Sequence, residues 1–257
     1  MLQVLRKLSW TAQGSVPAFK PVMEEMRTRY NRLRSRPHDR DFEVLRMLDA
    51  HAPGVYIDGG ANRGQSIQAI RLFRPSATII AFEANPRLAA MVAQRYSHDP
   101  AVKVVPAALG DQQGELDFFI PSYRGVEFDA LASADRSAAM EWINGTRVFF
   151  FDPTKLAARR VCCPVTTIDS EQLDPIFIKL DLQGFEYQAL HGAVETLLRC
   201  EPILMVEDYH GDPRLEPLAY SLGYREYYYD GASLVRGRAP STNAFLITEA
   251  RARAERL

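Results

Sequence analysis

The stretch that decides the fold runs from Val55 to Gln68 and reads VYIDGGANRGQSIQ. It predicts a short apolar strand, an acidic residue at the strand's carboxyl end, a glycine-rich turn and the start of a helix. Doubly wound α/β sheets bind ligands at the carboxyl ends of their strands, where glycines allow close backbone approach and a helix N-terminus offers N–H donors. The stretch therefore predicts a cofactor-binding loop.

Two kinds of cofactor could use such a loop. A dinucleotide is typically bound by G-x-G-x-x-G, whereas the run from Gly59 to Gly64 is G-x-A-x-x-G. Asp58 would repel a pyrophosphate and attract the amino and sulfonium groups of S-adenosylmethionine. The spacing Asp58-x-Gly60-x-Asn62-x-Gly64 also matches the D-x-G-x-G-x-G pattern of methyltransferases. Asn replaces the middle Gly, and Asn is the other residue that best tolerates a left-handed backbone.

Further candidates for cofactor contact follow the next strands. Glu83 comes nineteen residues after Gly64, where a doubly wound nucleotide site places the carboxylate that accepts from ribose hydroxyls. Gly110-Asp111 could supply an acceptor for an adenine amino group, although Gly-Asp is also an ordinary turn. The predicted cofactor-binding set is Asp58, Gly60, Ala61, Asn62, Gly64, Ser66, Glu83, Ala84, Gly110, Asp111 and Asp181.

Beyond this loop, short β-rich runs alternate with helical patterns. Strands are expected at 55–58, 78–83, 102–107, 115–120, 176–181 and 203–207. Helices are expected after Gly64, from Asn85-Pro86 with Asn as the cap, from about Glu186, and over 213–222. This alternation predicts an α/β fold of the Rossmann-like, doubly wound kind with a mostly parallel sheet.

Three other regions depart from the alternation. Residues 1–52 predict a helical extension with a basic face, made of one helix between Phe19 and Leu33 and another at about 41–52. Tyr224–Asp230 and Ser241–Thr248 predict an antiparallel hairpin that closes one sheet edge, followed by a charged tail at 251–257. The irregular, aromatic-containing segment 121–160 is expected to be a substrate wall or lid, or else to pack a small cluster of its own.

Composition excludes several classes of protein. The 257 residues carry 31 Lys and Arg against 32 Asp and Glu, so no global field would hold the chain on nucleic acid or an anionic membrane. The three cysteines have neither a disulfide framework nor the spacing of a metal site. No stretch approaches the roughly 18–20 apolar residues of a membrane span. We therefore expect a cytoplasmic protein without a nucleic-acid partner, whose N-terminal helices could join copies into a homo-oligomer.

Several motifs in one order resemble the FkbM family of S-adenosylmethionine-dependent methyltransferases. They are DGGANRGQS, AFEANP, ALGDQQGELDFF, TTIDS, IKLDLQGFEYQALHGA and PILMVE, between Asp58 and Glu207, with STNAFLI near the end. The resemblance implies a class I methyltransferase domain at 53–250, with a seven-stranded sheet whose last hairpin is antiparallel. It also implies O-methylation of a hydroxyl on a sugar or natural product, such as a lipid-linked glycan. Gln183 departs from the family's usual D-x-E-G-x-E, which puts a role for that carboxylate in doubt.

Methyl transfer to a hydroxyl requires the acceptor oxygen to be aligned and deprotonated, by a positioned base or by a metal ion. Two strand ends offer candidate groups, Asp181 with Lys179 and Glu186, and Glu207 with Asp208 and His210. Asp181 is the leading candidate, because a carboxylate that ends an apolar strand has few structural reasons to be there.

Three interpretations of these groups stay open. His210 or Glu207 could be the general base; Asp181, Glu207 and Asp208 could bind Mg²⁺; or a Lys179–Glu186 pair and an acid at a helix start could be structural only. Two other classes of function also stay open: an NAD-binding oxidoreductase, which Asp58 disfavours, and a catalytically inactive cofactor-binding module.

Overall fold

The computed structural model describes residues 36–49, 52–238, 240 and 242–257. They fall into two compact units, one of residues 36–115 with 163–257 and one of residues 116–162. The helix expected between Phe19 and Leu33, and any contact between copies through it, lie outside the described residues. No helix within the described ranges is long and apolar enough to cross a membrane.

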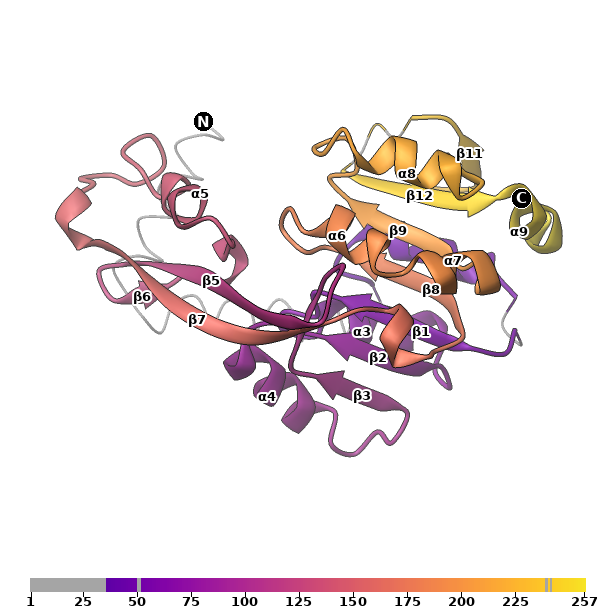
Figure 1. Cartoon of the computed structure of the whole chain (residues 1–257), viewed down its shortest axis with the longest axis horizontal. Coiled ribbons are helices and arrows are strands. Elements are labelled where there is room, and N and C mark those ends of the chain that lie inside the picture. Colours follow the sequence, from indigo (N-terminus) through magenta and orange to yellow (C-terminus); the bar gives the residue numbers. More distant parts are fainter. Residues whose placement is uncertain (1–35, 50–51, 239, 241) are drawn as a thin grey trace. The chain divides into compact units, whose positions relative to one another are not determined.

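The larger unit is built on an eight-stranded sheet with the order β11-β10-β12-β9-β8-β1-β2-β3 (Figure 1). Five of these strands run parallel: β1 (Val55–Gly59), β2 (Thr78–Phe82), β3 (Val102–Val105), β8 (Pro175–Leu180) and β9 (Ile203–Glu207). The chain moves outward from β1 to β3 and returns on the other side of β1 through β8. The carboxyl end of β1 is therefore a topological switch point, where doubly wound sheets bind their ligands.

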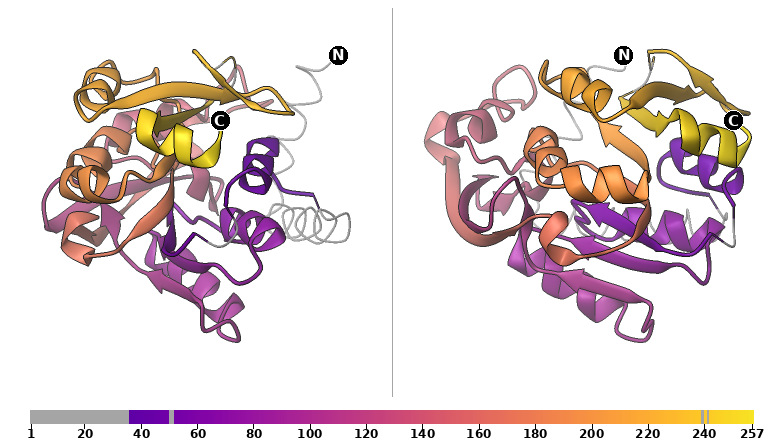
Figure 2. Two further views of the ribbon diagram at one scale, coloured as in Figure 1. Left: turned by 90° about the vertical axis from the view of Figure 1, so that its right-hand side faces the viewer. Right: turned by 45° about the vertical axis from the view of Figure 1, so that its right-hand side comes forward.

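Helices cover both faces of this sheet, as Figure 2 shows. Neighbouring residues of a strand point to opposite faces, so Tyr56 belongs to one buried core and Ile57 to the other. The first core includes residues of the 3₁₀ helix η1 (Arg40–Arg46) and the helices α3 (Gln65–Phe73), α4 (Pro86–Arg95) and α9 (Glu249–Glu255). The second lies under η4 (Asp169–Glu171), α6 (Glu186–His191), α7 (Val194–Cys200) and α8 (Leu215–Ser221).

The helix start at Asn85-Pro86 is confirmed. The Asn85 side chain accepts a hydrogen bond from the backbone N–H of Arg87 at 3.1 Å, and Pro86 opens the helix. Pro has no N–H to leave unsatisfied in the first turn, which explains why it suits this position. The helix expected at 41–52 is shorter than predicted and is the 3₁₀ helix η1.

The C-terminal hairpin forms but does not close the sheet. The strands β10 (Tyr224–Tyr229) and β12 (Asn243–Thr248) pair antiparallel, and β12 lies between β10 and β9. The Gly-rich connection contributes an additional strand, β11 (Leu234–Arg236), which pairs with the outer edge of β10. We expected seven strands in the main sheet, and the structure has eight. The additional strand is β11, because the open edge of β10 pairs with the segment that follows β10 in the chain.

Two helical predictions also need correction. The helix expected from Glu186 is split into α6 and α7 around Gly192, where a Cβ atom would come within 2.0 Å of the Gly110 carbonyl oxygen. The expected charged tail is the helix α9, with Thr248 as its cap and Ala252 in the core. The Thr248 hydroxyl accepts from the Arg251 N–H at 3.1 Å, which satisfies a donor of the first turn.

A second sheet has the order β4-β7-β5-β6. Its strands are β4 (Ala108–Leu109), β5 (Gly114–Tyr123), β6 (Val126–Glu127) and β7 (Leu156–Thr166). The strand expected at 115–120 thus belongs to this sheet and not to the main one. Residues 116–162 also contain η2 (Asp129–Leu131), α5 (Arg136–Glu141) and η3 (Pro153–Lys155). They bury a core of their own around Tyr123, so this segment is more regular than its sequence predicts.

Candidate functional site

The loop after β1 has three residues in the left-handed region. Gly60 has φ +78°, Asn62 +48° and Gly64 +81°, so the predicted tolerance of Asn62 for this backbone is confirmed. The N–H groups of Gly60 and Ala61 both donate to the carbonyl of Phe82 at 3.0 Å, and Gly64 N–H donates to Ala61 O at 2.7 Å. These contacts fix the loop between the ends of β1 and β2.

A buried lysine connects this loop to β8. The sheet register places Lys179 opposite Asp58, and the Lys179 ammonium donates to Gly59 O at 3.1 Å and Gly60 O at 3.0 Å. Its Nζ atom also lies 3.4 Å from Asp58 Oδ1 and 3.6 Å from Asp181 Oδ2. The charges of these carboxylates raise the pKa of Lys179 against the opposing effect of burial, so the ammonium stays charged.

Asp58 has acceptor capacity that the described residues do not use. Its side chain is fully buried, and neither carboxylate oxygen accepts a hydrogen bond from that part of the chain. Burial raises the pKa of Asp58, whereas the charge of Lys179 and the nearby hydroxyl of Ser66 lower it. A buried carboxylate in this state is suited to a ligand that brings positive charge and N–H donors. The amino group of S-adenosylmethionine fits that requirement.

Two carboxyl groups meet at the carboxyl ends of β8 and β9. Asp181 and Glu207 directly follow Leu180 and Val206, which are paired in the register between β8 and β9, and the pKa of each carboxyl group depends on the other. Burial opposes ionisation of Asp181, but Lys179, Glu207 and Gln183 together lower its pKa to about 2. The hydrogen bond with Asp181, burial and the charge of Asp181 raise the pKa of Glu207 to about 8. The pair therefore holds one proton near pH 7.

Gln183, where the family pattern has Glu, supports this pair. Its side-chain amide donates to Asp181 Oδ1 at 2.8 Å, a contact that an ionised Glu could not make. A Cβ atom on Gly60 would lie 1.9 Å from the Asp181 carbonyl oxygen, so only glycine fits beside this strand end. The cofactor loop and the carboxyl pair are thus in direct backbone contact.

Glu83 is buried and anchors two backbone segments. One oxygen accepts from Asn62 N–H at 2.6 Å and the other from Asn85 N–H at 2.8 Å. Burial raises the pKa of Glu83, and these two hydrogen bonds oppose that shift. Each oxygen keeps a second lone pair, so the predicted contact with ribose hydroxyls stays a prediction. The neighbouring Ala84 is half-buried.

Gly110 has a packing reason to be glycine. Its N–H donates to Thr166 O at 3.0 Å, and a Cβ atom there would meet Val165 at 2.7 Å. Asp111 next to it is exposed. Their predicted contact with an adenine ring stays a prediction.

Two of the candidate groups, His210 and Glu186, have hydrogen-bond partners of their own, and the predicted role of His210 as a base stays a prediction. His210 Nε2 is 2.9 Å from Glu226 Oε1 on β10, and neither Asp181 nor Glu207 is its partner. Glu186 accepts from the N–H groups of Leu182 and Gly184, at 2.6 and 3.0 Å. Glu186 thus stabilises the backbone at the start of α6, and the possible Lys179–Glu186 pair does not form, because Lys179 contacts the end of β1 and Asp181 instead.

The expected metal cluster does not form. Within the described ranges, no group of three or more His, Cys, Asp and Glu side chains is arranged to hold a metal ion. Asp208 is exposed and has a left-handed backbone with φ +49°, while Asp181 already contacts Lys179 and Gln183. The positive charge beside these two carboxylates comes instead from Lys179.

Comparisons with known proteins agree with this geometry. Residues 58–226 match the family model described as the methyltransferase FkbM domain. The curated 2-O-methyltransferase NoeI of Sinorhizobium fredii (strain NBRC 101917 / NGR234) is 25% identical over 163 residues, which are 61% of this chain and 64% of that protein. The chain thus spans just under two thirds of that relative.

Two solved structures show weaker likeness. A methyltransferase FkbM from Methylobacillus flagellatus KT aligns with a TM-score of 0.47 and 16% identity, over 79% of this chain and 47% of that one. A TehB-like SAM-dependent methyltransferase from Corynebacterium glutamicum aligns with a TM-score of 0.43 and 13% identity, over 91% and 99% of the two chains. The family assignment rests on the match of residues 58–226.

Proposed function

The chain belongs to the FkbM methyltransferase family, and from that premise we propose that it transfers a methyl group from S-adenosylmethionine to a hydroxyl oxygen of a sugar or a glycosylated natural product. When bound, S-adenosylmethionine supplies an activated methyl group on a sulfonium. The printed activity of the relative NoeI, a 2-O-methyltransferase, supports oxygen as the atom that accepts the methyl group.

The loop after β1 supports S-adenosylmethionine over a dinucleotide. Asp58 offers a buried carboxylate, paired with Lys179 through Oδ1, at the point where a dinucleotide would bring its pyrophosphate. Like charges at short range in a buried site repel strongly, whereas a protonated amino group is attracted. In this proposal Asp58 binds the amino group, the backbone of Gly60 to Gly64 lies against the cofactor, and Glu83 accepts from the ribose.

The observation that carries the proposal is the Asp181–Glu207 pair. A hydroxyl must lose its proton as it gains the methyl group, and the pair can take up that proton on a carboxylate oxygen. An effective general base has a pKa near the working pH, which the value of about 8 for Glu207 satisfies and the value of about 2 for Asp181 does not. Asp181 is the partner that keeps Glu207 in this range, and Lys179 keeps Asp181 ionised.

The test begins with the purified full chain, S-adenosylmethionine and a panel of methyl glycosides, with formation of S-adenosylhomocysteine and the mass of the product as readouts. A base must be unprotonated to accept, so kcat/KM should rise with pH through an apparent pKa of about 8. Glu207→Gln should remove this rise, and Asp208→Asn, one residue further along the chain, should keep it. Failure of the full chain to bind S-adenosylhomocysteine by calorimetry would refute the cofactor.

One result would identify a different base, and another would contradict the shared proton. If His210→Ala loses the rise and Glu207→Gln keeps it, His210 is the base. Titration of ¹³C-labelled Glu carboxyl groups by NMR follows Glu207 without any acceptor, and a value near that of an exposed Glu would contradict the shared proton. The predicted roles of residues 121–160 as a substrate wall and of residues 1–52 in acceptor choice stay predictions.

A further inference from the structure

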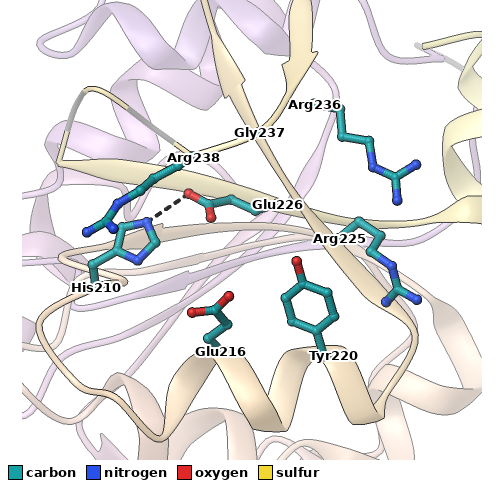
Figure 3. A pocket seen from close by; sticks show the side chains of 8 residues that line it. All are labelled: His210, Glu216, Tyr220, Arg225, Glu226, Arg236, Gly237 and Arg238. Carbon is teal, nitrogen blue, oxygen red and sulfur yellow. Dashed lines mark hydrogen bonds and ion pairs between the residues drawn. The ribbon is translucent and has the colours of Figure 1, made fainter.

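A polar cavity of about 270 Å³ lies between α8 and the outer edge of the main sheet, away from the loop after β1 (Figure 3). Figure 3 shows Glu216 and Tyr220 projecting from α8 toward β10, with Arg225 and Arg236 at one end, and Arg238 beside the His210–Glu226 pair at the other. Binding pockets for small molecules are mostly apolar. The many charged and hydrogen-bonding groups of this cavity point to a strongly polar ligand.

One end of the cavity is basic. The Arg225 guanidinium donates to Tyr224 O at 2.7 Å and lies 4.9 Å from the ring centroid of Tyr220. The Arg236 guanidinium is 2.9 Å from Glu249 Oε1, with both side chains about half exposed. A guanidinium has five N–H donors in a planar fork, so each arginine keeps donors for a carboxylate or a phosphate.

The other end carries acceptors together with a third guanidinium, that of Arg238. Glu226 is bonded to His210, and Glu216 faces the same space from α8. The ring of Tyr209 lies 5.1 Å from the His210 ring, and its buried hydroxyl has no hydrogen-bond partner among the residues the structure describes. Burial, followed by the charges of Glu216 and Glu226, raises the pKa of Tyr209. Such a set suits the hydroxyls of a sugar, each of which both donates and accepts.

The cavity is also near the proposed active site along the chain. His210 follows Glu207 by three residues, so their Cα atoms are at most about 11 Å apart. The volume lies just below the roughly 300–1,000 Å³ of ordinary ligand pockets and is suited to a single small ring.

We propose that this cavity binds one sugar unit of the acceptor, a unit that carries a carboxylate or phosphate group at the Arg225–Arg236 end and presents hydroxyls to Glu216 and the His210–Glu226 pair. This inference rests on the proposed function, because it treats the acceptor as a glycan. It specifies the acceptor as anionic.

The test is binding of three probes to the full chain by ligand-observed NMR or calorimetry: D-glucuronate, D-glucose 6-phosphate and the neutral D-glucose. Both anionic sugars should bind at least tenfold more tightly than D-glucose, and their relative affinities distinguish carboxylate from phosphate. Arg236→Gln should weaken the anionic sugars by roughly tenfold or more, the usual effect of losing a hydrogen bond to a charged group. Arg253→Gln, an equal change of charge on α9 outside the cavity, should leave them unchanged.

Equal binding of D-glucose, equal losses in the Arg236 and Arg253 variants, or no binding of any probe would overturn the proposal. Calorimetry with S-adenosylhomocysteine on the same protein separates this result from the proposed function. Cofactor binding without sugar binding refutes only the anionic subsite, and sugar binding without cofactor binding refutes the methyltransferase activity.

Discussion

Replacing Lys179 by an uncharged residue of similar size should strongly lower the stability of the folded protein. Its ammonium is within 3.6 Å of two carboxylates and donates to two backbone carbonyls, and the Lys179 and Asp58 side chains are 7% and 0% exposed. Solvent therefore screens the Lys179–Asp58 pair very little. Lys179→Met keeps most of the side-chain volume but leaves Asp58 buried without its counter-charge.

The expected loss of stability follows from that geometry. Removing one partner of a buried ion pair typically costs about 3–5 kcal/mol, because the remaining charge is left uncompensated. Asp58→Asn in the Lys179→Met background should recover part of this loss, since a neutral amide leaves no buried charge. We expect a coupling free energy of about 1.5–3 kcal/mol between the two positions, at the upper end for residues in contact.

The assay is urea denaturation followed by circular dichroism, applied to the wild type, both single variants and the double variant. Lys103→Met on β3, where the side chain is exposed, is the matched control and should change stability by no more than about 0.5 kcal/mol. Additive effects of the two substitutions, or a loss below about 1 kcal/mol in Lys179→Met, would refute the ion-pair argument.

The pH dependence of the stability of Lys179→Met is an independent test of the Lys179–Asp58 ion pair. Without Lys179, burial should hold the pKa of Asp58 above its value in the unfolded chain, so the folded variant binds a proton that the unfolded chain releases. The loss of stability in Lys179→Met should therefore shrink as the pH falls.

Two further predictions concern the cofactor loop. Gly60→Ala should destabilise the chain and abolish S-adenosylhomocysteine binding in calorimetry, because its Cβ would lie 1.9 Å from Asp181 O; Gly184→Ala, also at a positive φ but with nothing within 4 Å, should have the smaller effect. Glu83→Ala should weaken S-adenosylhomocysteine binding by about 1.5–3 kcal/mol, the value of a hydrogen bond to a charged group, and unchanged affinity would rule out the ribose contact. The thermal unfolding temperature of Glu83→Ala should also be lower than that of the wild type, because the backbone N–H groups of Asn62 and Asn85 lose their acceptor.

Local signals in the sequence were enough for the cofactor loop and the parallel part of the sheet. A strand, a turn with left-handed positions and a helix start depend on neighbours within a few residues, and Asn62 and the Asn85 cap behave as predicted. Because these signals are local, the sequence did not predict the break between α6 and α7 at Gly192 or the additional strand β11. Gly192, where α6 and α7 separate, lies against the backbone of Gly110, which is distant in the chain. β11 pairs with an edge of β10 that is left free after folding.

The chemistry of the candidate site was decided by tertiary structure. The motif around Lys179 and Asp181 is visible in the sequence, but the partner of Lys179 is set by a register between β1 and β8, which lie about 120 residues apart. Asp181 and Glu207 have similar ordinary pKa values, and only burial, the interaction between the two carboxyl groups and the nearby ammonium separate these values to about 2 and about 8. Residue types and strand ends can therefore be predicted from sequence, whereas protonation states arise from distances that only the folded chain creates.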